Sequence, residues 1–163
     1  MSKFALVRAL DALVRNGVRF IIIGGVAGRA WGSPSMTDDL DICYDRRPDN
    51  LEALVRALVE LKATLRGAPA GLPFQLDART LRAGDSFTFD TIAGSFDCLG
   101  TPTPTTGYDE LLVNATEVEI ENLRVLVCSL DDLIRMKRAA NRPKDRIELE
   151  ILAAVKEERE KLR

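Results

Sequence analysis

The sequence predicts a single α+β domain in which a mixed β-sheet is flanked by helices. Segments with apolar residues at helical spacing intermix with β-branched and alternating segments along all 163 residues. The composition, 46% hydrophobic and 29% charged, is typical of a globular chain that buries a sizeable core. We therefore expect one domain over residues 1–163, ending in a helical pair over about residues 129–163.

The first part of the chain is predicted to alternate helices with strands. Apolar residues at helical spacing predict a helix over residues 4–14, and a β-branched run predicts a buried strand over residues 18–23. A glycine pair closes this strand before a short helix or turn over residues 26–31. Residues 38–44 alternate as a strand does, and a proline then begins a long amphipathic helix over residues 48–65.

The middle of the chain is richer in turns. Residues 67–84 contain many glycines, prolines and alanines with no sustained period, which predicts a loop holding at most a short helix over residues 78–81. Two strands are expected over residues 87–92 and 95–99, separated by an Ala-Gly turn. Residues 101–107 form a polar connection that contains prolines.

The last part of the chain returns to alternating elements. A helix over residues 108–115 is followed by strands over residues 117–120 and 125–128. Two helices then finish the chain, over residues 130–140 and 143–161. The intermixing of both element types indicates a mixed sheet with helices packed on it.

The sequence contains no histidine, which narrows the possible chemistry. Ser-His-Asp hydrolases, cysteine-histidine enzymes and histidine-ligated zinc enzymes are excluded. Cys43, Cys98 and Cys128 are widely spaced, which indicates buried apolar side chains rather than disulfides or zinc ligands. Catalysis by this chain must use carboxylates, lysines, hydroxyls or an oxygen-ligated metal.

Neither a membrane nor a uniformly basic surface is indicated. No apolar run approaches the roughly 20 residues that a membrane helix requires. Arg8, Asp11 and Arg15 interrupt the segment in which a signal peptide needs an apolar core. We therefore expect a cytoplasmic protein without a membrane partner. The formal net charge of -2 excludes a basic coat but allows a local basic patch.

The strand predicted over residues 38–44 carries the clearest sign of chemistry. In a strand, Asp39 and Asp41 face the same side, with their Cα atoms roughly 7 Å apart. Two adjacent carboxylates repel each other unless a cation lies between them, and Mg²⁺ binds carboxylates together with phosphate oxygens. This pair predicts a magnesium site, although an isolated Asp-Leu-Asp is more often the solvent face of an edge strand.

A third carboxylate is expected from residues 95–99. Alternation there places Phe96 and Cys98 on the core face and Asp97 on the opposite face. Neighbouring strands lie only about 4.8 Å apart, so Asp97 can join the two upstream aspartates. Asp90 is the alternative, but the clean core face favours Asp97. Three carboxylates suit two divalent ions roughly 4 Å apart, the arrangement used in phosphoryl transfer.

The segment before the aspartates has features of a phosphate site. Gly24 and Gly25 follow the buried strand and allow close backbone approach to an anion. Ser33, Ser35 and Thr37 add hydroxyl donors in the loop that leads to the carboxylates. For the glycine pair alone, a tight strand-to-helix turn is nearly as good an interpretation. The segment matches neither a Walker loop nor the dinucleotide-binding glycine pattern.

A concentrated basic stretch lies near the C-terminus. Six cations and a single aspartate occur within it: Arg135, Lys137, Arg138, Arg142, Lys144, Arg146 and Asp145. The asymmetry suggests a phosphate-binding patch on an otherwise acidic protein. Lys137, at the edge of an apolar helical stripe, and Lys144 are the candidate phosphate contacts.

Together, these motifs resemble those of the DNA polymerase beta-like nucleotidyltransferase superfamily. The resemblance rests on a glycine pair after an apolar strand, 13 intervening residues, an Asp-Leu-Asp strand and a later strand aspartate. The segment SLDDLIRMKRAANRPKD is also similar to the closing motif of small prokaryotic members, the minimal nucleotidyltransferases and abortive-infection toxins. The resemblance implies a polymerase beta palm-like fold. It also implies that Asp39, Asp41 and Asp97 bind two Mg²⁺ ions and that Gly24 and Gly25 hold nucleotide phosphates.

The function implied by this resemblance is Mg²⁺-dependent, with ATP or another nucleoside triphosphate as substrate. A nucleoside monophosphate would pass to an acceptor hydroxyl of a protein, a tRNA or a small molecule, with Lys137 and Lys144 as basic contacts. The alternative is a weakly active or inactive component of a toxin–antitoxin pair that acts by binding a partner protein. Two departures from many small relatives motivate it: Trp31-Gly32 stands where they carry His-Gly, and Ser35 where they carry Arg.

Overall fold

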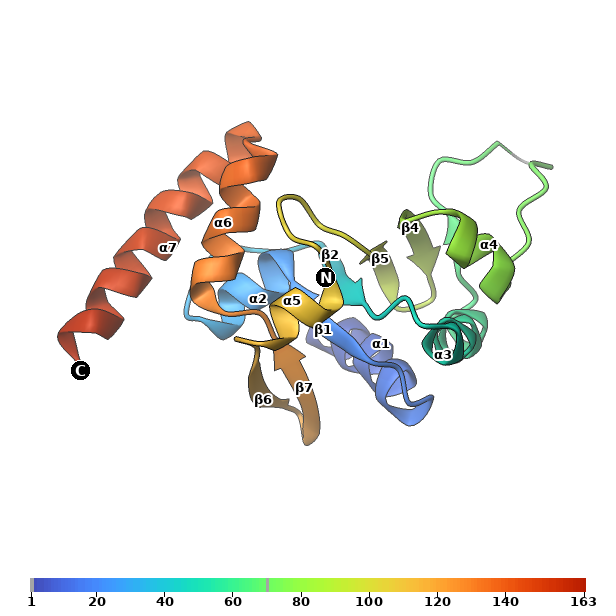
Figure 1. Cartoon of the computed structure of the whole chain (residues 1–163), viewed down its shortest axis with the longest axis horizontal. Coiled ribbons are helices and arrows are strands. Elements are labelled where there is room, and N and C mark those ends of the chain that lie inside the picture. Colours follow the sequence, from blue (N-terminus) through green and yellow to red (C-terminus); the bar gives the residue numbers. More distant parts are fainter. Residues whose placement is uncertain (1, 70) are drawn as a thin grey trace.

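A mixed β-sheet organises the computed structural model, which describes residues 2–69 and 71–163 (Figure 1). Its seven strands follow the order β3-β4-β5-β2-β1-β7-β6. The strands are β1 (Phe20–Ile23), β2 (Asp39–Tyr44), β3 (Thr64–Leu65), β4 (Ser86–Thr91), β5 (Gly94–Leu99), β6 (Thr116–Ile120) and β7 (Leu123–Val127). Strand β1 pairs antiparallel with β2 and parallel with β7, and β2 pairs parallel with β5. The predicted α+β class with a mixed sheet is confirmed.

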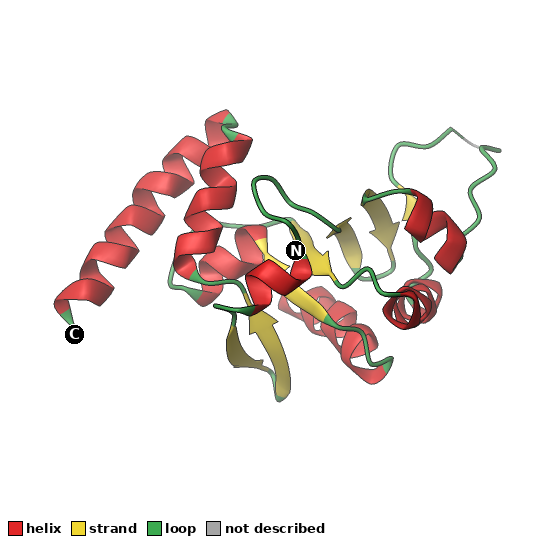
Figure 2. Cartoon of the chain, in the orientation of Figure 1, coloured by secondary structure: helices red, strands yellow, loops and turns green. Residues whose placement is uncertain are grey.

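The helices form two groups around this sheet (Figure 2). They are α1 (Lys3–Arg15), α2 (Gly24–Ala30), α3 (Pro48–Glu60), α4 (Ala78–Ala83), α5 (Tyr108–Leu112), α6 (Leu130–Ala140) and α7 (Pro143–Lys161). Helix α1 contacts α3, which contacts α4, whereas α2 contacts β1, β2 and α6. Helices α6 and α7 pack against each other at the opposite end of the view from α4 (Figure 1).

The predicted helix over residues 48–65 is wrong at its C-terminal end. Helix α3 ends at Glu60, and Lys62 adopts a left-handed backbone conformation with φ of 53°. The chain then turns, and Thr64 and Leu65 form β3 opposite Asp90 and Phe89 of β4. Helical spacing of leucines continues past the true end because Leu65 belongs to the same core from a different element.

The core lies where the strands alternate. Leu40 and Ile42 of β2 and Cys98 of β5 are fully buried, while the aspartates between them face the other side of the sheet. All three cysteines are buried and free, as the sequence predicts. Among the described residues, none of the helices is both long enough and apolar enough to cross a bilayer.

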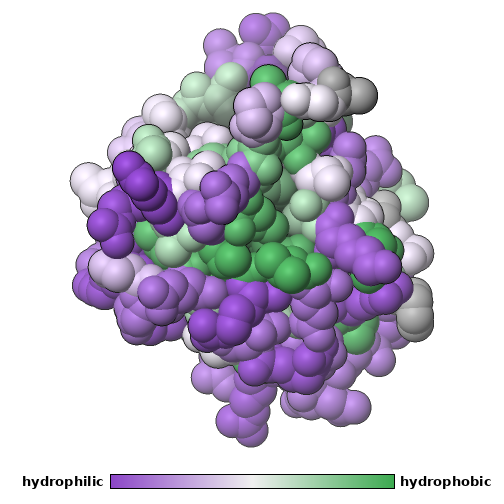
Figure 3. Space-filling view, turned by 90° about the vertical axis from the view of Figure 1, so that its right-hand side faces the viewer, coloured by the Kyte–Doolittle hydropathy of each residue, from purple (hydrophilic) through white to green (hydrophobic). Residues whose placement is uncertain are grey.

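The end of the molecule that carries α3 and α4 has an apolar area on its surface. Seen from the side that carries α3 and α4, hydrophobic residues gather at the centre of the surface and hydrophilic residues surround them (Figure 3). Exposed Val59 and Leu72 belong to α3 and to the loop before α4, respectively. Exposed apolar side chains also occur elsewhere, for example Ile147 on α7.

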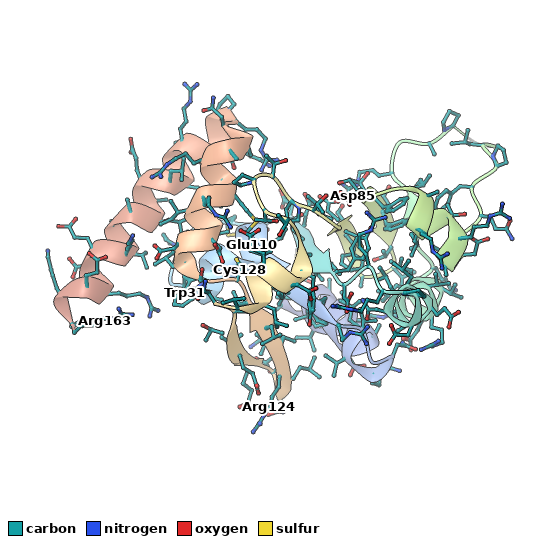
Figure 4. The ribbon with its side chains drawn as sticks, viewed as in Figure 1. Trp31, Asp85, Glu110, Arg124, Cys128 and Arg163 are labelled. Atoms are coloured by element: carbon teal, nitrogen blue, oxygen red, sulfur yellow. The ribbon has the colours of Figure 1, made fainter. Side chains whose placement is uncertain are left out.

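Trp31 fixes the C-terminal helices relative to the glycine-rich segment. Its indole Nε1 donates to the backbone oxygen of Cys128 at 2.9 Å, joining the end of α2 to the end of β7 (Figure 4). The guanidinium of Arg159 in α7 lies 4.7 Å from the centre of the indole ring, within cation–π range. One side chain thus links the end of α2 to the end of β7 and to α7.

Candidate active site

Strand register brings two of the predicted carboxylates side by side. Asp41 of β2 is directly opposite Asp97 of the parallel strand β5, and their carboxyl groups lie within hydrogen-bonding reach. Asp39 precedes Asp41 on the same face and contributes to its electrostatic environment. Asp90, the alternative third carboxylate, is opposite Ser95 instead and lies farther from β2. The arrangement therefore favours Asp97 over Asp90.

The charge on Asp41 is only weakly compensated. Burial raises its pKa, and so do the hydrogen bond with Asp97 and the negative charges of Asp97 and Asp39, to about 7. The positive charge of Lys137 acts in the opposite direction but does not balance these effects. A carboxylate with a raised pKa beside two like charges is a suitable position for a cation.

The glycine pair makes room for these side chains. A Cβ atom added at Gly24 would overlap the carboxylate of Asp41, and Gly24 has a φ of +67°, which favours glycine. A Cβ added at Gly25 would lie 2.6 Å from Thr37 Oγ1. Because Ile23 is opposite Asp41 in the β1–β2 ladder, the turn begins directly beside the carboxylate. Both glycines therefore allow close packing between this turn and the acidic strand.

The hydroxyl-bearing loop divides into an exposed and a buried part. Thr37 lines the cleft and donates to the backbone oxygen of Asp39 at 3.1 Å. Ser33 is buried, does not line the cleft, and accepts a hydrogen bond from the backbone N–H of Ser35. Ser35 donates to Oε2 of Glu148 in α7, which attaches the loop to the C-terminal helix.

These residues face a cleft of about 800 Å³. Its lining includes all the predicted site residues except Ser33: Gly24, Gly25, Thr37, Asp39, Asp41, Asp97, Lys137 and Lys144. The carboxylates lie on the sheet side, and the cations come from α6 and α7 on the other. A cavity with negative charge on one wall and positive charge on the other fits a metal-bound polyphosphate chain.

The cationic wall is built around one buried carboxylate. Asp145 accepts hydrogen bonds from the backbone N–H of Arg142 at 3.0 Å and from its Nε at 2.7 Å. Burial of Asp145 favours its neutral form, but these hydrogen bonds outweigh it and hold its pKa below the usual range. Lys137 Nζ lies 3.8 Å from the same carboxylate. Asp145 thus holds both cations at the corner between α6 and α7.

Part of the predicted basic patch is neutralised. Arg135 pairs with Glu110 of α5 at 3.0 Å and with Asp132 at 3.1 Å, which ties α6 to the body of the domain (Figure 4). The six cations therefore do not form one continuous patch. Only Lys137, Arg142 and Lys144 line the cleft.

The donor set fits a divalent oxygen-loving cation, although the ligands are not fully gathered. Within residues 2–69 and 71–163, no group of three or more potential ligand residues stands ready to hold a metal. Asp97 Oδ1 instead accepts a hydrogen bond from Arg66 Nη2 at 3.1 Å. The hydrogen-bonded Asp41 and Asp97 and the uncompensated charge are nevertheless the chemistry that Mg²⁺ prefers.

Three further residues contribute to this region. The sequence places Arg142 in the basic stretch without choosing it as a phosphate contact, and it does not indicate the other two. Arg142 lines the cleft, and the charges of Asp41 and Asp97 contribute to its raised pKa after those of Asp145. Its position before Pro143 and three residues before Asp145 is a helix-start signal that marks the corner. Glu148 and Arg66 left no local signal, because their contacts join segments that are distant in the chain.

Comparison with solved structures identifies the fold. The crystal structure of the lincosamide antibiotic adenylyltransferase LnuA with lincomycin bound has a TM-score of 0.66 at 11% identity, covering 95% of this chain and 98% of that chain. A putative nucleotidyltransferase from Thermotoga maritima has a TM-score of 0.56 at 16% identity, covering 89% and 88%. The solution structure of the antibiotic-resistance factor ANT(2'')-Ia has a TM-score of 0.59 at 16% identity, covering 93% and 82%.

Comparison by sequence finds no relative: no family model and no curated protein matches the chain. The structural matches span nearly the whole chain. The chain therefore has the nucleotidyltransferase fold, which confirms the fold that the sequence motifs imply.

Proposed function

We propose that this chain transfers a nucleoside monophosphate from a nucleoside triphosphate to an acceptor hydroxyl with the help of Mg²⁺. Its nucleotidyltransferase fold supports this proposal. The observation that carries the proposal is the pairing of Asp41 with Asp97 at the cleft, beside a glycine turn that a Cβ atom would block. Electrostatic repulsion between these carboxylates raises the free energy of the folded chain. Binding of a cation together with a phosphate would offset this repulsion.

The residues have separate tasks in this reaction. Asp39, Asp41 and Asp97 would hold Mg²⁺, which would supply positive charge to the phosphate oxygens and favour deprotonation of the acceptor hydroxyl. The backbone at Gly24 and Gly25 accommodates the phosphate chain at close range.

The bond changes follow from these positions. The acceptor oxygen forms a bond to the α-phosphorus, the bond from that phosphorus to the pyrophosphate oxygen breaks, and Asp97 takes the hydroxyl proton. Lys137 and Lys144 compensate the charge of the departing pyrophosphate. The protein contributes positioning and charge compensation, and it forms no covalent intermediate.

A small molecule is our first choice of acceptor. Two of the similar structures are of antibiotic-resistance proteins, one of them bound to lincomycin. An opening of about 800 Å³ accommodates a nucleotide together with a compact acceptor. Transfer RNA and a protein hydroxyl are the other two acceptor classes to test.

A catalytically silent member that binds a partner protein is the second candidate. The observation in its favour is the ion pair between Arg66 and Asp97, which engages a proposed metal ligand. The weakly compensated charge of Asp41 argues against this candidate, because an inactive site gains nothing from keeping like charges together.

A nucleotide-transfer assay separates the two candidates. Purified protein is incubated with Mg²⁺, nucleoside triphosphates labelled at the α-phosphate and the three acceptor classes. We expect Asp41→Asn to lower transfer by about 10³-fold, because the lost charge stabilises the transition state. Asp131→Asn, on the exposed face of α6, is the matched control and should transfer at the wild-type rate. Transfer that survives Asp41→Asn, or none by the wild type with any acceptor, overturns the proposal.

A further inference from the structure

Arg66 is a cation behind the acidic side of the cleft, in contact with Asp97, that the proposed mechanism does not use. It follows β3, and its Nη2 donates both to Asp97 Oδ1 at 3.1 Å and to the backbone oxygen of Phe89 at 2.9 Å. Its Nε donates to Asp90 Oδ1 at 3.2 Å. One guanidinium thus joins a proposed metal ligand to a carboxylate outside the metal site.

The backbone and the surroundings hold Arg66 in this place. Its N–H donates to the backbone oxygen of Thr88 at 3.0 Å, which extends the pairing of β3 with β4 by one residue. The Arg66 side chain is 33% exposed and that of Asp97 19%, so water screens this ion pair less than an open surface pair. The contact is therefore a defined interaction of the folded chain.

This ion pair engages one of the two carboxylate oxygens of Asp97, a proposed metal ligand. Oδ1 of Asp97 accepts a hydrogen bond from the guanidinium of Arg66. Among the described residues, no group of three potential metal ligands is already assembled. We propose that Arg66 is a cationic latch, which holds Asp97 through Oδ1 until a divalent cation takes its place. The inference rests on the proposed function, because it assumes that these carboxylates bind a metal.

The second anchor makes such an exchange reversible. When Arg66 releases Asp97, its hydrogen bonds to Asp90 and to the Phe89 oxygen remain available. The released guanidinium is therefore not left as an unpaired charge, a state that is costly in a partly buried place. Asp90, which the strand register places away from Asp41, thus acquires a positioning role through Arg66.

The latch has a measurable consequence for metal affinity. Removing Arg66 removes both a competitor for Asp97 and a positive charge close to the metal site, and both changes favour cation binding. We expect Arg66→Gln to bind Mn²⁺ about tenfold more tightly than the wild type, with Arg66→Ala changed in the same direction. Titration calorimetry with Mn²⁺ alone, without nucleotide, measures this and requires no enzymatic activity.

The control variants make the result specific. Arg124, at the tip of the β6–β7 hairpin, is an exposed arginine whose replacement by alanine should leave Mn²⁺ affinity unchanged (Figure 4). Circular dichroism establishes that the variants are folded, and Arg66→Gln serves if Arg66→Ala does not fold. An unchanged or weaker Mn²⁺ affinity in folded Arg66→Gln overturns the latch.

The same titration separates failure of the latch from failure of the proposed function. If wild-type protein binds Mn²⁺ and Asp41→Asn abolishes the binding, the metal site stands whatever Arg66→Gln shows. If the wild type binds no Mn²⁺ and Arg66→Gln binds none either, both proposals are overturned.

Discussion

Asp41 within β2 and Asp45 just past its end show how one residue type serves two purposes. Asp45, just past the strand, is buried, and it accepts hydrogen bonds from Arg19 Nε at 2.7 Å and from the backbone N–H and Nη1 of Arg47, each at 3.0 Å. Burial alone would raise the pKa of Asp45, but the two arginines outweigh it and lower that pKa. Asp41, four residues earlier, has carboxylates as its nearest charged neighbours and a raised pKa.

The difference between the two carboxylates indicates which one stabilises the fold and which one is available to bind a ligand. At Asp45, each oxygen is matched by a donor of this chain, so the carboxylate contributes to stability. At Asp41, Lys137 offsets the negative charges only in part, so a bound cation would supply the remaining positive charge. An ionisable group that is partly buried and poorly compensated, at a cleft, is the pattern expected of a binding site.

The largest effect on stability is expected at the compensated end. Asp45→Asn leaves Arg19 and Arg47 without their shared carboxylate, although both keep contacts with exposed carboxylates. We expect the free energy of unfolding to fall by about 3 kcal/mol, because buried Asp45 loses its charge-assisted hydrogen bonds with two partly exposed arginines and with the backbone N–H of Arg47. Chemical denaturation at pH 7 measures it.

This variant also tests whether the two ends are independent. The nucleotide-transfer rate of folded Asp45→Asn at low temperature should equal that of the wild type. A stability loss under about 1 kcal/mol would mean that Asp45 is not the structural carboxylate assumed in the comparison.

A smaller effect is expected where the backbone approaches Asp41. Gly24→Ala places a methyl group against the Asp41 carboxylate at a positive φ, and we expect a loss of about 2 kcal/mol in stability. Transfer and Mn²⁺ affinity should fall as well, because Asp41 must move. Gly17→Ala is the matched control: its φ is +73° and an added Cβ meets no atom within 4 Å, so only the backbone cost remains. Equal losses of stability, transfer and Mn²⁺ affinity in the two variants would show that the contact between Gly24 and Asp41 does not matter for the site.

The sequence predicts this contrast only in part. The twofold period of a strand is local, so it places Asp39, Asp41 and Asp97 on the face opposite the core without any knowledge of the fold. Which strands are neighbours is a long-range property, and the sequence alone left Asp90 open as the third carboxylate. The register of β2 with β5 favours Asp97, since Asp41 is opposite it.

Contacts between distant segments account for what the sequence did not predict. The two-residue strand β3 exists through its pairing with β4, and Arg66 reaches Asp97 only because of that pairing. Ser33 has the same hydroxyl as Ser35, but a backbone hydrogen bond to Gly28 O turns its position into the interior. The roles of such residues follow from their neighbours in space and cannot be predicted from the residue type alone.

The two aspartates affect the pH dependence of stability in opposite directions. An unfolded aspartate has a pKa near 3.9, whereas Asp41 in the folded chain has a pKa of about 7. Between these values the folded state binds the extra proton, so the stability that Asp41 provides in its protonated form is lost as pH rises from about 4 to about 7. For Asp45 the sign is opposite, because its lowered pKa gives stability that is lost only in acid.

In chelator, Asp41→Asn should therefore be more stable than the wild type by about 1–2 kcal/mol at pH 8, with a smaller difference at pH 5. This gain is a fraction of the full pKa shift, because relaxation and water reduce the charge repulsion. Thermal or chemical unfolding at both pH values measures it, and added Mg²⁺ should stabilise the wild type alone. If the variant is less stable than the wild type at pH 8, the Asp41 carboxylate is compensated within the chain. The contrast with Asp45 would then no longer hold.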